Sequence, residues 1–78
     1  MYLHIGMNVY ILSERIIGIF EASEFQSMID PTFWQHIRRV DHQLEAHTVK
    51  SYILTTLQEI HCSNVHCRTL KKRWNKDT

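Results

Sequence analysis

The first twenty residues alternate between short β-type runs and turn residues. Residues 2–5 and 9–12 are aromatic, aliphatic or β-branched at most positions, and residues 6–8 separate them. This pattern predicts a β-hairpin that turns around Gly6 to Asn8. After the polar corner at residues 13–15, residues 16–20 predict a third, more buried strand, in which Gly18 marks a bulge or a close backbone approach.

From residue 21 the apolar spacing lengthens from that of a strand to that of a helix. Asp30 is a favourable N-cap residue, and Pro31 suits the first helical position. One face of the predicted helix then carries Phe33, Trp34, Ile37 and Val40, and the other side carries most of Gln35, His36, Arg38 and Arg39. Residues 42–49 are typical of a loop, with room for a short extended piece.

The last third of the chain predicts two more strands and a helix. Residues 51–56 and 59–62 are the strands, joined near Leu57 and Gln58. A basic C-terminal helix follows at about residues 65–76, capped by Ser63 or Asn64, with an inward stripe of Cys67, Leu70 and Trp74. The order β-β-β-α-β-β-α predicts one small α+β domain over residues 1–78, with two helices covering part of a mainly antiparallel sheet.

The charges are segregated along this chain. The C-terminal helix is free of acidic residues through Lys76, whereas the first thirty residues hold four carboxylates against a single arginine. A cluster of cations creates a local positive field, which makes nucleic acid the leading candidate partner. Two alternatives remain open: a solvated helix whose cations complement its macrodipole, or pairing of this helix with acidic surface on a second subunit.

Length and composition limit the kind of protein. A chain of 78 residues is near the lower limit for a self-sufficient core, which favours oligomerisation. The start of the chain lacks the basic region and apolar stretch of a secretory signal, and no apolar run is long enough to cross a bilayer. We therefore expect a cytoplasmic protein with no membrane partner, in which Cys62 and Cys67 are reduced.

Catalytic and metal-binding patterns are weak. There is no glycine-rich phosphate loop, no nucleophile at an informative distance from a base and no paired carboxylates, so we expect neither an enzyme nor a cofactor. His61-Cys62 and His66-Cys67 suggest zinc, but adjacent side chains on a strand point to opposite faces and cannot readily bind one ion. We expect no metal, one buried cysteine and histidines at the surface; nothing in the sequence places the six histidines together.

Three patches of sequence carry a resemblance. They are residues 1–6 (MYLHIG), residues 15–20 (RIIGIF), and Ser63 followed by residues 69–73 (TLKKR). Together and in this order they resemble the extracellular-matrix regulatory protein family of Gram-positive bacteria, the RemA/RemB type, and are closer to its RemB branch. The resemblance covers residues 1–20 and 50–73, and it leaves residues 21–49 without a functional interpretation.

The resemblance implies a DNA-binding transcriptional regulator of extracellular-matrix and biofilm genes. It implies a fold like the LytTR DNA-binding domain and a ring-shaped homo-oligomer that presents arginines to double-stranded DNA. One of these arginines falls on Arg15. A second arginine cluster of the family falls near residues 47–50, where only Lys50 is firmly charged. This departure supports an alternative: an oligomeric protein-interaction subunit, with a paralogous partner, that has lost DNA binding.

Phosphate contacts supply most non-specific DNA affinity, so the candidate DNA-binding residues are cations. Arg15 is the strongest candidate, because a corner arginine between two strands is held rigidly; its alternative role is an ion pair with Glu14. The full set is Arg15, Lys50, Arg38, Arg39, Lys71, Lys72 and Arg73. The DNA-binding hypothesis requires these side chains to face one direction, within one subunit or across several.

Overall fold

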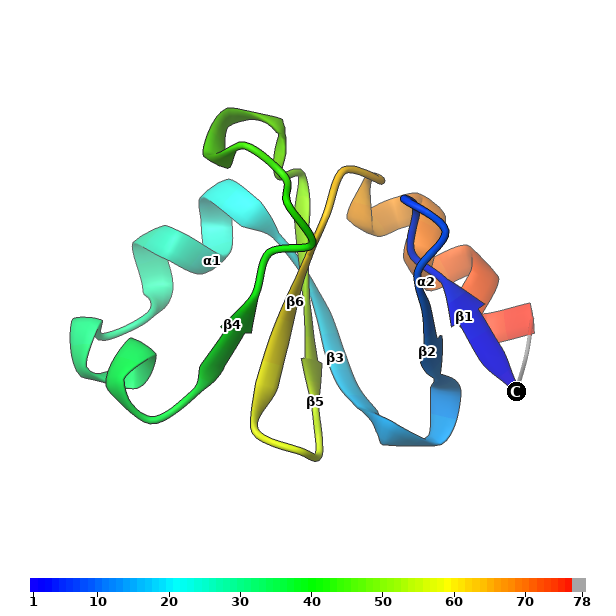
Figure 1. Ribbon diagram of the computed structural model, residues 1–78, viewed down its shortest axis with the longest axis horizontal. Helices are drawn as coiled ribbons and strands as arrows, with labels where there is room; N and C mark the ends of the chain where they lie inside the picture. Colours follow the sequence, from blue (N-terminus) through cyan, green and yellow to red (C-terminus); the bar gives the residue numbers. More distant parts are fainter. Residues whose placement is uncertain (77–78) are drawn as a thin grey trace.

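A computed structural model describes residues 1–76 and contains two sheets and two α-helices. The strands are β1 (Tyr2–His4), β2 (Tyr10–Leu12), β3 (Ile16–Glu21), β4 (Arg38–Val40), β5 (Ser51–Thr55) and β6 (Glu59–Ser63). The helices are α1 (Ala22–Met28) and α2 (Cys67–Lys76), with 3₁₀ turns at Ser13–Arg15, Pro31–Gln35 and Ala46–Thr48. The α+β class is confirmed, and the predicted order is retained with one short strand, β4, added (Figure 1).

The predicted hairpin is confirmed. Strands β1 and β2 pair antiparallel with Leu3 opposite Ile11, and residues 6–8 turn with positive φ angles. Gly6 has a φ angle of 94°, a backbone conformation that residues other than glycine rarely adopt. A Cβ atom at Gly6 would also lie 2.7 Å from Oδ1 of Asn64. Glycine at this position therefore allows both the turn and its close packing against the segment before α2.

The larger sheet has the strand order β3-β5-β6-β4. Strands β3, β5 and β6 are antiparallel neighbours, whereas β4 pairs parallel with β6 at the far edge. The register shifts between Ile16 and Gly18, which confirms the irregularity predicted at Gly18. The turn between β5 and β6 falls at residues 56–58, as expected from the sequence.

The middle of the chain corrects the sequence-based prediction, because no helix spans residues 31–40. Helix α1 begins at Ala22, directly after β3, where the carboxylate of Glu21 accepts the Ser23 N–H at 3.0 Å. Asp30 caps only a 3₁₀ turn, and the chain then extends into β4. Three residues of the predicted apolar face, Phe33, Trp34 and Ile37, still pack inward, whereas the predicted backbone path is wrong.

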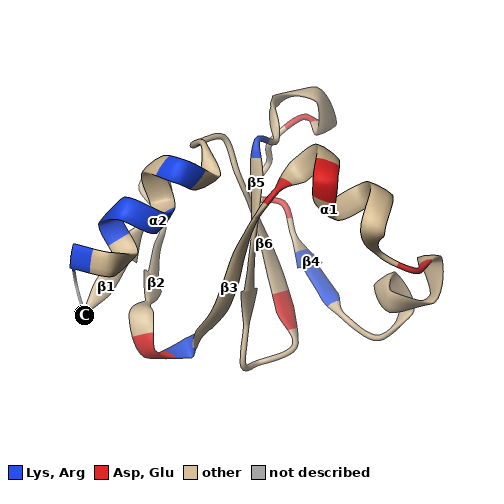
Figure 2. Ribbon diagram, turned by 180° about the vertical axis from the view of Figure 1, so that it is seen from behind, with Lys and Arg blue, Asp and Glu red and all other residues tan. Residues whose placement is uncertain are grey.

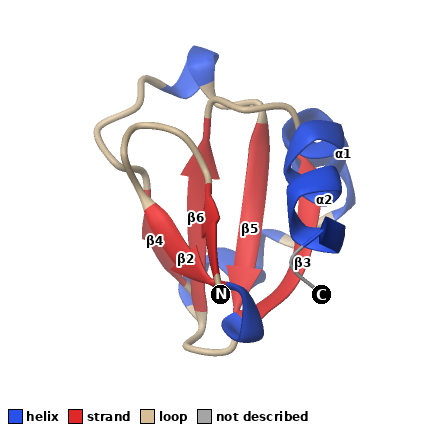
Figure 3. Cartoon of the chain, turned by 90° about the vertical axis from the view of Figure 1, so that its right-hand side faces the viewer, coloured by secondary structure: helices blue, strands red, loops and turns tan. Residues whose placement is uncertain are grey.

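Both faces of the larger sheet are packed. On one face, Ile19 and Ile53 pack with the hairpin and with Leu70 of α2. On the other, Tyr52 and Ile60 pack with Phe25 of α1 and with residues of the 3₁₀ turn. In Figure 3 both helices lie beside β3, the edge strand that each of them contacts. Successive side chains of a strand point to opposite faces, so neighbouring residues of β5 and β6 serve different cores.

Helix α2 carries the predicted inward stripe: Leu70 is buried, and Cys67 and Trp74 pack beside it. The predicted cap is wrong, because Ser63 lies in β6 and His66 directly precedes the helix. The hydroxyl of Ser63 donates to the Ile5 carbonyl at 2.6 Å and accepts the Val65 N–H at 3.0 Å. Ser63 therefore joins the hairpin to the larger sheet.

Candidate nucleic-acid interface

Arg15 ends the 3₁₀ turn between the two sheets, and its backbone is fixed on both sides. The Ser13 N–H donates to the Met1 carbonyl at 2.7 Å, and the Arg15 carbonyl accepts the Thr56 N–H at 2.8 Å. Glu14 does not pair with Arg15; its carboxylate lies 3.1 Å from the amino group of Met1. Within residues 1–76 the exposed guanidinium of Arg15 has neither an ion pair nor a hydrogen bond, which leaves it available to an anion.

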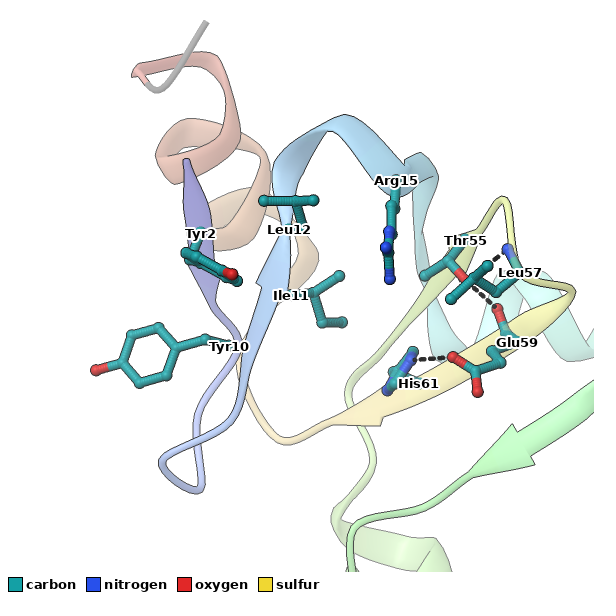
Figure 4. A pocket seen from close by; sticks show the side chains of 9 residues that line it. All are labelled: Tyr2, Tyr10, Ile11, Leu12, Arg15, Thr55, Leu57, Glu59 and His61. Atoms are coloured by element: carbon teal, nitrogen blue, oxygen red, sulfur yellow. Dashed lines mark hydrogen bonds and ion pairs between the residues drawn. The ribbon is translucent and has the colours of Figure 1, made fainter.

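Arg15 lines a groove of about 270 Å³ between the hairpin and the larger sheet, here called the hairpin groove. Figure 4 shows the Arg15 side chain directed into this groove. The other lining residues are Tyr2, Tyr10, Ile11, Leu12, Thr55, Leu57, Glu59 and His61. Tyr2 and Tyr10 are 66% and 60% exposed. The groove thus combines an unpaired cation with two accessible phenol rings.

A chain of polar side chains forms the sheet side of this groove. Arg38 Nη1 lies 3.0 Å from Glu59 Oε2, and Glu59 Oε1 lies 3.3 Å from His61 Nε2. His61 Nδ1 in turn lies 2.8 Å from Nε2 of His42, with the two rings stacked. Burial lowers the pKa of both histidines, and the proximity of His42 lowers that of His61 further. The structure therefore favours a neutral, hydrogen-bonded histidine pair.

Arg38 and Arg39 lie on the edge strand β4 and not on a helix, so they point to opposite faces of the sheet. Arg38 belongs to the hairpin-groove face through its pair with Glu59. Arg39 lies over the rings of Trp34 and Tyr52, at 5.5 and 5.6 Å from their centroids. Both arginines are exposed, as predicted, but the helix predicted to carry them is wrong and they lie on opposite faces of the sheet.

Lys50 is exposed and precedes β5, at the end of the β3–β5 pair opposite to Arg15. The Lys50 carbonyl accepts the Ala22 N–H at 3.0 Å, whereas Arg15 bonds to Thr56 at the other end. The two cations are roughly 20 Å apart, from a rise of about 3.3 Å per residue along β3. One subunit therefore cannot bring Arg15 and Lys50 onto the same phosphate.

The cations of α2 lie on different sides of the helix. Lys72 is exposed, Lys71 lines a second groove between α1 and α2, and Arg73 donates to the His4 carbonyl at 3.0 Å. Figure 2 shows the cationic positions of α2 and of β4 at opposite sides of the molecule. The predicted residues do not form one continuous face within one chain. The structure groups only Arg15 and Arg38, which flank the turn between β5 and β6.

The sequence-based prediction missed the aromatic and histidine residues of the hairpin groove. The strand alternation of Tyr2 with Leu3, and of Tyr10 with Ile11, is the signal that would have placed both tyrosines outward. No local signal joins His42 to His61, because their contact depends on the pairing of β4 with β6. The expectation that nothing brings histidines together is corrected by this contact.

In the histidine–cysteine pattern that suggested zinc, His61 and Cys62 lie on opposite faces of the sheet. His61 lines the hairpin groove, whereas Cys62 is buried with Phe25 and Tyr52 on the other face, so their predicted opposite orientation is confirmed. Burial raises the pKa of the Cys62 thiol. Among residues 1–76 no three His, Cys, Asp or Glu side chains are placed to hold a metal ion. In the same part of the chain, no helix has the length and apolarity that a bilayer crossing requires.

The chain folds as a small α+β domain with an exposed arginine in a groove beside its larger sheet. The chain is 28% identical over 75 residues to extracellular matrix regulatory protein B of Bacillus subtilis (strain 168). This alignment covers 94% of the chain and 89% of that protein. The resemblance predicted from the three sequence patches is confirmed as a distant relationship over nearly the full length. No family model matches the chain.

Proposed function

We propose that this chain is a DNA-binding regulator of extracellular-matrix genes that acts as a ring-shaped homo-oligomer. The proposed contact is made to backbone phosphates of double-stranded DNA by Arg15, with Tyr2 and Tyr10 beside it. Arginine and tyrosine are both common donors to phosphate and sugar oxygens, and such contacts position a protein on the duplex without reading its sequence. Sequence preference would then come from the shape of the DNA.

The observation that carries this proposal is the unpaired guanidinium of Arg15. Its backbone is held by the Thr56 hydrogen bond and its side chain is exposed. Glu14, its neighbour in sequence, and Glu59, which lines the same groove, are both paired with other groups. The distant similarity to a matrix regulatory protein supplies the biological setting. A fixed backbone with an unpaired guanidinium suits a repeated phosphate contact, because little conformational entropy is lost on binding.

The need for several copies of the Arg15 contact supports a ring-shaped oligomer. Arg38, Arg39 and Arg73 are engaged within the chain, and the other predicted cations lie on different sides of it, so one copy does not present them together to DNA. In a closed oligomer the second and later contacts become effectively intramolecular, and weak single contacts give strong overall binding. Several copies of Arg15 along one duplex would therefore provide the affinity that a single copy lacks.

The test is a gel-shift titration with random duplex DNA for the parent, Arg15→Ala and Arg68→Ala. Arg68→Ala removes the same charge from the start of α2, near Glu21 and away from Arg15. We expect Arg15→Ala to weaken binding at least tenfold and to flatten the dependence of log affinity on log salt, by about 0.9 for each lost phosphate contact. Arg68→Ala should retain most of the affinity. Equal binding by parent and Arg15→Ala at moderate salt would contradict the proposal.

A second candidate function is an oligomeric protein-interaction subunit, with a paralogous partner, that has lost DNA binding. The engagement of Arg38, Arg39 and Arg73 in contacts within the chain favours this alternative. A size measurement run beside the gel shift separates the two functions. An oligomer that does not shift DNA at low salt would support the interaction subunit and exclude the DNA-binding one.

A further inference from the structure

A second groove, of about 330 Å³, lies between α1 and α2, with β3 at its base. Figure 2 shows β3 between the two helices. Strand β3 is an edge strand of the larger sheet, because it has a paired neighbour, β5, on one side only. The lining is mainly apolar and includes Ile19, Phe20, Leu54, Phe25, Met28, Ile29, Phe33 and Cys67. No residue lines both this groove and the hairpin groove.

The groove between α1 and α2 reaches around the edge of β3 to both faces of the sheet. Ile19 packs in the core on the hairpin side together with Leu70 of α2. Phe20 points to the other face, where its ring centroid lies 5.0 Å from that of Phe25 in α1. Successive side chains of a strand point to opposite faces. A groove lined by both Ile19 and Phe20 therefore follows the strand edge, with α2 on one face and α1 on the other.

The outer edge of β3 offers unpaired backbone groups to this groove. The Ala22 N–H donates to the Lys50 carbonyl at 3.0 Å, in continuation of the β3–β5 register. Residues that bond to the partner strand alternate along an antiparallel pair, so Phe20 and Gly18 bond to β5 and Ile19 turns its N–H and C=O outward. Within residues 1–76 no backbone hydrogen bond joins this outer edge to another segment. Such an edge is a template for a further strand.

The edge is also accessible and unprotected. Ile17 and Phe20 of β3 are 57% and 36% exposed, and Met28 of α1 is 80% exposed. The Phe20 ring lies over Gly18, where an added Cβ would come within 2.8 Å of Cζ of Phe20. Strand β3 carries neither lysine nor proline, the residues that often prevent an edge from pairing. Exposed apolar side chains beside an open edge are typical of a binding site.

We propose that an extended peptide segment of another protein binds in this groove as an additional strand on β3. In this mode of recognition, backbone hydrogen bonds supply affinity and pockets for alternate side chains supply specificity. Alternate side chains of the added strand point to opposite faces of the sheet, so one set contacts α1 and the other contacts α2. The surface is separate from the hairpin groove, and the inference does not depend on the proposed function.

The charges of the groove define the chemistry of this peptide. Glu21 and Glu24 lie on the α1 side, and Lys71 lies on the α2 side. Within residues 1–76 neither Glu24 nor Lys71 forms an ion pair. The peptide therefore has apolar side chains at alternate positions, with a lysine or arginine toward α1 and an acidic residue toward α2. Nucleic acid does not fit, because its phosphates would face Glu21 and Glu24 and the apolar lining would stay uncovered.

The first test selects a phage-displayed library of random heptapeptides on the parent chain and measures the enriched peptides by fluorescence anisotropy. We expect alternating apolar residues with at least one lysine or arginine. Met28→Glu should weaken binding by about tenfold or more, because the peptide would bury an unpaired carboxylate. Met28 is exposed, so the variant should keep the melting temperature of the parent. Thr56→Glu, which adds the same charge at an exposed turn position, is the matched control and should bind like the parent.

The second test asks whether the peptide adds a strand. Proline at the central position of an enriched peptide removes a backbone N–H and should weaken binding about tenfold, whereas alanine there should weaken it less. Nuclear Overhauser contacts should join backbone protons of the bound peptide to the Ile19 amide. A peptide that binds through apolar contacts alone, for example as a helix, would tolerate its backbone change and would lack these contacts.

The third test exchanges charges between the chain and the peptide. Lys71→Glu should weaken binding about fivefold, because an attractive contact becomes repulsive. A peptide whose acidic residue is replaced by lysine should recover the lost affinity. Recovery by the exchanged peptide shows that the two side chains face each other, since damage to the fold of the variant would persist.

The outcomes that overturn the inference are distinct. A selection without enriched peptides, or peptides that bind Met28→Glu like the parent, excludes the groove as a peptide site. Peptides that bind without contacts to Ile19 exclude strand addition. If peptide affinity falls as the chain itself assembles at higher concentration, a second copy occupies β3 and the proposed partner is wrong. The gel shift with Arg15→Ala tests DNA binding separately, so either proposal can fail while the other stands.

Discussion

Two grooves of the molecule differ in chemistry: the hairpin groove, and a groove between α1 and α2 at the edge strand β3. The hairpin groove combines an unpaired arginine, two exposed tyrosines and a hydrogen-bonded histidine pair. The groove between α1 and α2 is lined mainly by apolar side chains, with Glu21 and Glu24 at one side and Lys71 at the other. Because side chains alternate along a strand, the adjacent residues His61 and Cys62 contribute to different faces. A short sheet can thus present a polar surface and an apolar one at the same time.

Incomplete coverage is the reason that both grooves exist. The hairpin and α2 cover the β3 side of one face, whereas on the other face α1 packs on β3 and β5 and the following 3₁₀ turn packs near β4. Each face therefore has a packed part and an open part. If this description is right, substitutions in the packed parts will change stability on both faces, whereas substitutions in the open parts will change binding.

The largest expected effect is the loss of packing in either core. Phe25→Ala should lower the free energy of unfolding by about 3–5 kcal/mol, and Ile53→Ala by about 2–5 kcal/mol. Phe25 contacts the rings of Phe20, Phe33, Trp34 and Tyr52, and Ile53 is fully buried on the opposite face. Urea unfolding followed by circular dichroism measures both changes.

Leu57→Ala is the control for these two core variants. Leu57 is 55% exposed in the turn between β5 and β6, so its truncation should change stability by less than about 0.5 kcal/mol. A small effect of either Phe25→Ala or Ile53→Ala would show that one face is not packed and would remove the basis of the comparison.

A smaller effect is expected where the hairpin is attached to the larger sheet. Ser63→Ala removes the hydroxyl that bonds to the Ile5 carbonyl at 2.6 Å, and it leaves that buried carbonyl without this partner. The expected cost is about 1–3 kcal/mol in the free energy of unfolding. Ser27→Ala is the matched control, because the Ser27 hydroxyl is exposed on α1. Equal stability of the two variants would mean that Ser63 does not hold the hairpin.

The smallest effect concerns the histidine pair and depends on pH. The folded chain holds the pKa of His42 and His61 below the ordinary value of 6.5, so the unfolded chain binds more protons as the pH falls through 6.5. Stability should therefore be full above about pH 7.5 and should decrease as the pH falls below 6.5. Asp41, Glu59 and Arg38 are the charged groups that face the pair.

Thermal melts between pH 5 and pH 8 test this expectation. His42→Gln cannot titrate at this position, so its stability should depend less on pH, and at neutral pH it should cost about 1 kcal/mol for the changed hydrogen bond. His36→Gln, at an exposed position, should retain the pH dependence of the parent. Glu14, Glu21 and Asp30 have lowered pKa values and titrate in a separate window at lower pH. If the dependence of stability on pH were unchanged in His42→Gln, the histidine pair would not be its source.

Much of the fold was predictable because its signals are local. The hairpin follows from alternation around residues 6–8, and α2 follows from the spacing of Cys67, Leu70 and Trp74. The helix predicted from residue 31 failed because the apolar spacing of Phe33, Trp34 and Ile37 also fits a 3₁₀ turn followed by a strand. Parallel pairing with β6, more than twenty residues away, decided between them.

The candidate site was predictable only in part. The exposure of Arg15 follows from its polar corner between two strands, and the structure places it there. The partners of Arg38, Arg39 and Arg73 are Glu59, the rings of Trp34 and Tyr52, and the His4 carbonyl, and all of these contacts except that with Trp34 join distant segments. Which cations remain free is therefore a property of the tertiary structure.

The sequence by itself determined the α+β class, the hairpin, the buried residues of α2 and the segregation of acidic and basic residues. These follow from alternation, spacing and charge within a few consecutive residues, where backbone geometry alone relates one side chain to the next. Only the tertiary structure decided which face each cation occupies, which histidines meet and where the apolar groove lies open. Those features depend on pairing between distant strands, whose energy comes from contacts that no local segment contains.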